Sequence, residues 1–102
     1  MPDLKKTITA QLKDSARVLT ATAKQAAAID KAAQALLRTF RNGGKLLSFG
    51  NGGSSCDAQN FADELTGRYR RNRPPLPAMA LTTNQGDLTS IANDFGFEHV
   101  FE

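Results

Sequence analysis

Hydrophobic positions recur every three or four residues from residue 4 to residue 40, with charged and polar side chains between them. This period is typical of amphipathic helices, so we expect one helix from Leu4 onward and a second that ends at Asn42-Gly43-Gly44. No glycine or proline lies between Thr20 and Asp30, so a single bent helix is an alternative to two. The second stretch places its apolar residues on one side, namely Ile29, Ala32, Ala33, Leu36, Leu37 and Phe40.

The pattern changes after Gly44. Short apolar runs at 45–49 and 77–81 are each followed by a polar or glycine-rich turn and then by a helical pattern. This β-α-β-α order predicts an α/β fold, in which helices flank a parallel sheet. Ligands of such sheets bind at the carboxyl ends of the strands, where we expect Asn51 to meet the loop 82–85. The chain stops at Glu102 within a segment that resembles a helix, so we expect it to be truncated.

The turn between the first predicted strand and its helix is rich in glycine. Gly50, Gly52 and Gly53 allow a tight reversal and a close approach of backbone N–H groups to a ligand. Ser54 with Asp57 fits a capping box, which predicts that Ser54 or Ser55 caps the helix. A helix that begins here would bind anions or polyols. The turn has neither a Walker motif nor a dinucleotide fingerprint in register, and many such turns are simple connections.

Composition limits the alternatives. The 102 residues carry a net charge of +3 and 40% hydrophobic side chains, enough for one small domain. Cys56 is the single cysteine and no apolar segment is long enough to span a bilayer, so we expect a cytoplasmic protein without a membrane partner. The arginine-rich segment 68–73 is interpreted as a solvated helix end rather than a nucleic-acid surface. Within it, Arg68 follows Glu64 by four residues, which predicts a shared helix face.

Several sequence blocks at matching spacing closely resemble the phosphoheptose isomerases, which are sugar isomerase (SIS) domain proteins. The blocks are Gly50-Asn51-Gly52-Gly53-Ser54, Asp57-Ala58, Phe61-Ala62-Asp63-Glu64-Leu65-Thr66-Gly67-Arg68-Tyr69-Arg70 and Asn93-Asp94-Phe95-Gly96-Phe97. The resemblance implies that residues 45–102 form the first part of a flavodoxin-like SIS domain. It also implies that residues 1–44 form helices that serve packing and oligomerisation. It also implies a homotetramer, with a phosphate loop and a catalytic histidine beyond Glu102.

The resemblance further implies an activity and its residues. The family interconverts sedoheptulose 7-phosphate and D-glycero-D-manno-heptose 7-phosphate in heptose and lipopolysaccharide biosynthesis. Glu64 is the implied base for this proton transfer, which needs a carboxylate or a similar group. The implied substrate-binding residues are Asn51, Gly52, Gly53, Ser54, Glu64, Arg68, Asn93 and Asp94.

The resemblance implies a zinc site, but this chain lacks one of the family's metal ligands. Zinc-binding members have a histidine four residues before the glutamate, where this chain has Asn60. An amide oxygen is a poorer zinc ligand than imidazole, so Asn60 beside Glu64 disfavours zinc. His99 lies far along the chain and is interpreted as a surface or helix histidine.

Two other functions stay open. One is a non-catalytic SIS module that binds a sugar phosphate or a protein partner, as the DnaA initiator-associating protein does. The other is a sugar-phosphate sensor, which Asn60 favours. The block from Phe61 to Arg68 favours the isomerase, because the DnaA-associated relative lacks it in this form.

Overall fold

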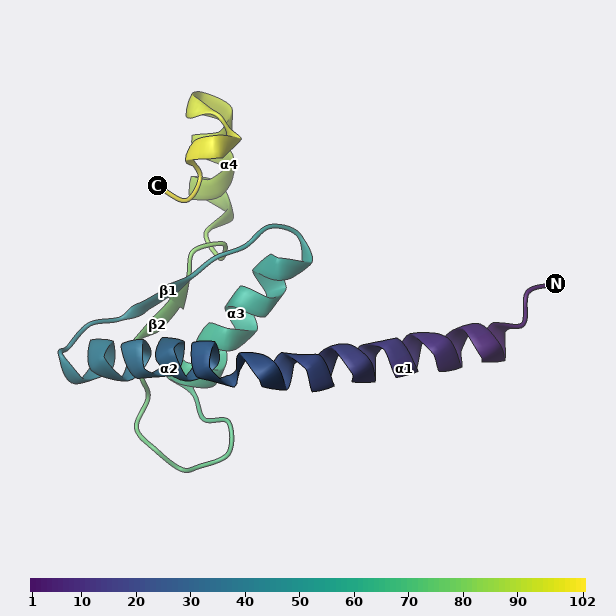
Figure 1. Ribbon diagram of the computed structural model, residues 1–102. Helices are drawn as coiled ribbons and strands as arrows, with labels where there is room; N and C mark the ends of the chain where they lie inside the picture. The colour runs from purple at the N-terminus through teal and green to yellow at the C-terminus, as the bar shows by residue number, and fades with distance from the viewer. The chain divides into compact units, whose positions relative to one another are not determined.

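The computed structural model describes all residues from Met1 to Glu102. They form two compact units, Met1–Ala35 and Leu36–Glu102. Figure 1 shows the elements, which are α1 (Leu4–Thr22), η1 (Ala23–Gln25), α2 (Ala26–Arg41), β1 (Leu46–Ser48), α3 (Gly53–Thr66), β2 (Ala78–Ala80), α4 (Gln85–Phe95) and η2 (Phe97–His99). The predicted division of roles at residue 44 stays a prediction.

The first unit is helical from Leu4 onward. α1 passes through the single 3-10 turn η1 into α2, and the backbone of Thr22, Ala23 and Ala26 stays in the right-handed helical region. The sequence left open whether one helix or two fill this stretch. The answer is two α-helices joined by a tightened turn, without a loop that would let them fold back on each other.

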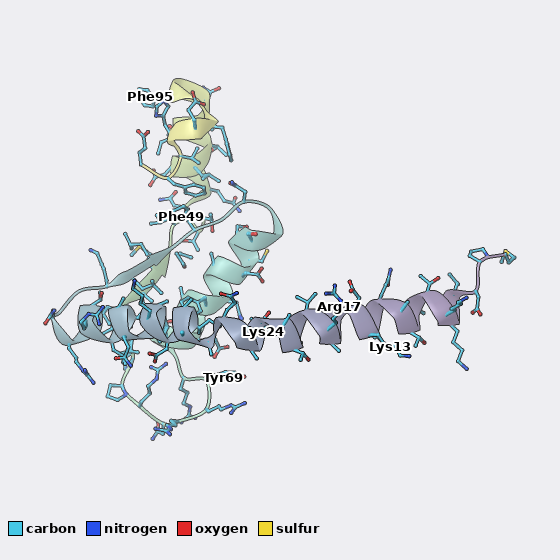
Figure 2. All side chains as sticks on the ribbon, viewed as in Figure 1. Lys13, Arg17, Lys24, Phe49, Tyr69 and Phe95 are labelled. Carbon is cyan, nitrogen blue, oxygen red and sulfur yellow. The ribbon has the colours of Figure 1, made fainter.

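The apolar face of α1 is uncovered in the chain. Leu12 is 67% exposed and Leu19 is 73% exposed, and α1 contains no buried residue. Figure 2 shows the side chains of this helix, with Lys13 and Arg17 labelled. The prediction that this face packs against other subunits is therefore compatible with its exposure and stays a prediction.

The second unit contains the predicted parallel sheet. β1 and β2 pair in parallel with Leu46 opposite Ala78 and Ser48 opposite Ala80, and α3 lies beside them (Figure 1). α2 ends at Arg41, and Gly43 follows with φ +76°, as the Asn-Gly-Gly pattern predicted. The predicted α/β order is confirmed, although each strand is only three residues long.

The core of this unit is small. Its buried side chains are Ala58 and Ala62 from α3, Ala80 from β2, and Val100 near the C-terminus. Alanine lets α3 approach the sheet closely, because it adds only one methyl group between helix and strands. None of the helices is long and apolar enough to cross a membrane.

The C-terminal segment differs from the prediction of a continuing helix. α4 ends at Phe95, and Gly96 follows with φ +107°, a conformation that favours glycine. After it, the chain forms only the 3-10 turn η2, in which Val100 N–H donates to the Phe97 carbonyl at 3.2 Å. A short 3-10 turn that follows Gly96 directly therefore stands where the sequence predicted a helix.

Candidate functional site

The glycine turn starts α3 earlier than the capping-box interpretation predicted. Gly52 is the N-cap, with φ +55° and ψ −129° and without a side-chain cap. Ser54 lies inside the first turn, where its N–H donates to the Asn51 carbonyl at 3.0 Å. The prediction that Ser54 or Ser55 caps the helix is wrong. Glycine reaches a positive φ at little cost, so the chain enters the helix before either serine.

This turn leaves backbone donors free for a ligand. The N–H groups of Asn51, Gly52 and Gly53 make no hydrogen bond within the chain. Ser55 instead serves the turn itself, because both its N–H and its hydroxyl donate to the Gly52 carbonyl, at 3.1 Å and 2.6 Å. Consecutive unpaired N–H groups at a helix N-terminus suit phosphate, carboxylate or sugar oxygens.

A cavity of about 330 Å³ joins the glycine turn to the loop after β2. Its polar wall includes Asn51, Ser55, Thr82 and Gln85. The meeting of Asn51 with the loop 82–85, predicted from the order of the strands, is therefore confirmed. The lining is completed by Gly50, Gly52, Leu88, Phe97 and Phe101.

Sequence reasoning missed several residues of this cavity. Ser55 was considered only as a helix cap, and Phe97 and Phe101 were not assigned to the site. Phe101 reaches it through a ring contact with Phe49, with 4.8 Å between the ring centroids. Phe49 is labelled just after β1 in Figure 2. Of the predicted residues, Gly53 and Ser54 adjoin the cavity along the chain but are not among its lining residues.

Glu64 lies in a different place from the glycine turn. It is half-buried near the C-terminal end of α3, roughly three helical turns or about 16 Å along the axis from Gly53. It lines a second cavity of about 320 Å³, together with Phe61, Leu65, Tyr69 and Arg73. Its carboxylate makes no hydrogen bond or ion pair. The chain therefore does not bring Glu64 together with the glycine turn in one cavity.

Arg68 does not share a helix face with Glu64, as the four-residue spacing had predicted. α3 ends at Thr66, and Gly67 continues with a φ of −94° and a ψ of −131°. Arg68 lies beyond the helix, and its guanidinium donates to the Asn72 side-chain oxygen at 3.1 Å. The prediction is wrong because the helix ends before the periodic pattern does. A role for Arg68 in substrate binding stays a prediction.

Asn93 and Asp94 lie in the last turn of α4. The Asn93 amide donates to the Asp94 carboxylate at 3.1 Å, and both residues are exposed. Neither residue lines the glycine-turn cavity. Their predicted contact with sugar hydroxyls stays a prediction.

The donors that this chain contributes to the implied zinc site are too few to hold that metal by themselves. Asn60 is exposed and Glu64 is half-buried, so α3 offers one amide oxygen and one carboxylate on one face. No group of three or more His, Cys, Asp or Glu side chains is placed to hold a metal ion. His99 contacts Glu102 at 2.9 Å and Glu98 at 3.9 Å. Protein zinc sites have at least three protein ligands, usually including His or Cys.

Residues 11–102 match the family model described as the SIS domain. The chain belongs to the SIS domain family. The match includes most of α1 and all of α2. Most of the N-terminal helical region, which was predicted to be separate from the α/β domain, therefore lies within the matched residues. The family resemblance inferred from the glycine turn and the block after it is confirmed.

Named relatives of this SIS domain chain are phosphoheptose isomerases. The protein from Glaesserella parasuis is 56% identical over 73 residues, covering 72% of this chain and 38% of the relative. The protein from Haemophilus ducreyi is 48% identical over 97 residues, covering 92% of this chain and 50% of the relative. The SIS domain chain thus spans half or less of the length of these curated relatives.

Solved structures of phosphoheptose isomerases share the fold of this chain. A phosphoheptose isomerase from Neisseria gonorrhoeae is 41% identical with a TM-score of 0.87, covering 96% of this chain and 50% of that chain. One from Francisella tularensis is 38% identical with a TM-score of 0.90, covering 99% of this chain and 53% of that chain. The predicted SIS-type fold is therefore confirmed.

Proposed function

We propose that the protein is a phosphoheptose isomerase, which interconverts sedoheptulose 7-phosphate and D-glycero-D-manno-heptose 7-phosphate. The observation that carries the proposal is the cavity at the carboxyl ends of β1 and β2, where Asn51 and Gly52 meet Thr82 and Gln85. Its unpaired backbone donors suit the oxygens of a sugar phosphate. Relatives with this name, 48% to 56% identical, support the same assignment.

Glu64 is the proposed base. Isomerisation between a ketose and an aldose removes a proton from the carbon beside the carbonyl, forms an enediol and returns a proton to the neighbouring carbon. A carboxylate can accept and return that proton, and the reaction involves no net oxidation or reduction. The half-buried carboxylate of Glu64, without a hydrogen-bond or ion-pair partner in the chain, is suited to this role. Since the donors on α3 are too few to hold zinc by themselves, no step is assigned to a metal.

The distance between Glu64 and the glycine turn supports a site shared between copies. The roughly 16 Å of helix between them exceeds the few ångströms over which a base can take a proton. We propose that Glu64 of one copy acts on a sugar bound at the glycine turn of another. The exposed apolar face of α1 supports such an assembly, for which we propose the homotetramer that the family resemblance implies.

A cytoplasmic role in lipopolysaccharide heptose synthesis completes the proposal. A second candidate is a SIS module that binds a sugar phosphate without turning it over. It is favoured by the separation of Glu64 from the glycine-turn cavity within one chain. The two candidates differ in one measurable property, because both bind the sugar phosphate but only one releases the isomer.

The test is turnover of sedoheptulose 7-phosphate by the complete gene product, compared with Glu64→Gln and with Asp63→Asn as the matched control. We expect Glu64→Gln to lower kcat by about 10² to 10⁴-fold, the usual contribution of a general base. Asp63 is the exposed neighbour on α3, so its variant should keep the wild-type rate.

Two outcomes contradict parts of the proposal. Binding without turnover in the unchanged protein would favour the non-catalytic module. Full turnover in Glu64→Gln would remove Glu64 from the mechanism. Adding a chelator tests whether turnover needs a metal ion. Loss of turnover would show a metal requirement that the donors on α3 do not predict.

A further inference from the structure

The C-terminal end of α3 is held by a side chain from outside the helix. Its last turn contains no basic residue, although the exposed carbonyls there favour positive charge. Arg73, which comes from the loop between α3 and β2, supplies that charge. Its guanidinium donates to the main-chain oxygen of Glu64 at 2.8 Å and to that of Leu65 at 3.0 Å.

Arg73 also forms a hydrogen bond within its own loop. The same guanidinium nitrogen that reaches Leu65 donates to the Pro74 carbonyl at 3.0 Å. The Leu76 N–H donates to the Leu65 carbonyl at 2.9 Å, so the loop is tied to the helix end at two points. Figure 2 shows Tyr69 on this loop, after α3.

These contacts leave the Glu64 side chain unpaired. Arg73 and Glu64 line the same cavity, yet the guanidinium binds the main-chain oxygen of Glu64 and not its carboxylate. A forked cation beside a carboxylate usually forms a bidentate pair with it. Here three carbonyl oxygens accept hydrogen bonds from the guanidinium. No hydrogen bond or ion pair joins the guanidinium to the Glu64 carboxylate, which keeps its lone pairs for another partner.

We propose that Arg73 is a positioning residue for Glu64, an inference that rests on the proposed isomerase function. By holding the backbone at residues 64 and 65, it fixes the place from which the Glu64 carboxylate meets the substrate. Misplacement of a catalytic group by about 1 Å can lower turnover a hundredfold. Binding of the sugar phosphate at the glycine turn depends on other residues, so it should not depend on Arg73.

The test compares Arg73→Met and Arg73→Lys with Arg71→Met in the complete gene product. Arg71 lies in the same loop, is exposed and makes no hydrogen bond or ion pair. We expect Arg73→Met to lower kcat by about tenfold to a hundredfold with little change in KM. Arg73→Lys, which retains a donor and the charge, should recover part of the loss, and Arg71→Met should match the unchanged protein.

A second readout does not depend on activity. Amide hydrogen exchange should be faster at Leu76 in Arg73→Met and unchanged in Arg71→Met, because Leu76 N–H shares its acceptor with Arg73. If the unchanged protein turns over substrate and Arg73→Met keeps its kcat, the positioning role is wrong. If the unchanged protein has no turnover, the isomerase function fails, and the positioning role fails with it whatever the exchange rates.

Discussion

The hydroxyl of Ser48, the last residue of β1, donates a 2.7 Å hydrogen bond to the main-chain oxygen of Ala58 in the middle of α3. This bond joins the strand that leads into the glycine turn to the helix that leaves it. With Ala58 and Ala62 buried at the same contact, α3 is held close to the sheet. The angle between strand and helix that shapes the glycine turn is therefore set by a polar contact and two small side chains.

Replacing Ser48 with Ala should destabilise this connection. We expect the free energy of unfolding to fall by about 1 kcal/mol, the usual net value of one hydrogen bond. Chemical denaturation would measure it. Ser90→Ala is the matched control, because Ser90 is exposed on α4 and no hydrogen bond is found for its side chain. Equal stability of both variants would mean that the Ser48 bond contributes nothing net.

The three glycines of the turn should respond differently to alanine. A Cβ at Gly50 would lie 2.8 Å from the main-chain carbon and oxygen of Ser54, whereas Gly52 has open space but a φ of +55°. We expect Gly50→Ala to destabilise by about 1 to 3 kcal/mol through overpacking, and Gly52→Ala by a similar amount through backbone strain.

Gly53→Ala is the control within this series. A Cβ at Gly53 meets nothing within 4 Å and its φ is not positive, so alanine should keep stability or raise it by about 1 kcal/mol or less. Denaturation curves of the three variants test the order. A Gly53 variant as unstable as the other two would contradict this geometry of the turn.

The order of elements could be predicted from the sequence because its signals are local. The change from a helical period to short apolar runs after Gly44 indicates where the sheet begins. The parallel pairing then places Asn51 near Gln85 without further information. Both the sheet and this cavity were predicted correctly for that reason.

The ends of α3 could not be predicted in the same way. At its start, a serine cap and a glycine cap both satisfy the local pattern, and the positive φ of Gly52 decides between them. At its end, the periodic pattern runs on to Arg68, but Arg73 and Leu76 from the following loop bind the last carbonyls. Ser55 was missed because the glycine cap, and not a serine cap, starts α3 and leaves Ser55 beside the turn. Phe97 and Phe101 were missed because their place in the cavity depends on how the chain returns after Gly96.

Replacing Asn60 with His tests how close the chain is to a zinc site. The introduced imidazole and the Glu64 carboxylate would lie one turn apart on the same face of α3, a spacing that lets both bind one metal ion. They would supply two of the three or more protein ligands of a zinc site, and the others would come from another copy or from a part of the relatives' length that this chain does not span. We expect the purified Asn60→His variant to contain more zinc than the unchanged protein, measured by elemental analysis. Gln59→His, an exposed neighbour on α3, is the control for zinc bound by any added histidine. Equal zinc in the two variants would count against a metal site at this position.

Mixing two inactive variants tests the shared site. Under the proposed function, Glu64→Gln lacks the base and Asn51→Ala weakens the glycine-turn cavity, and each copy supplies what the other lacks. If the two residues meet between copies, equal co-expression should restore about a quarter of the unchanged activity, because half of the copies carry each intact part. If they act within one chain, the mixture should be no more active than the average of the two variants.

The control carries both substitutions in one chain and is co-expressed with the unchanged chain in equal amounts. If the site is shared, two unchanged copies must meet to form it, and the mixture should keep about a quarter of the activity. If the site lies within one chain, the mixture should keep about half. The two mixtures together distinguish the arrangements, because only a shared site makes them equally active. That equality would explain why one chain holds Glu64 and the glycine turn in separate cavities.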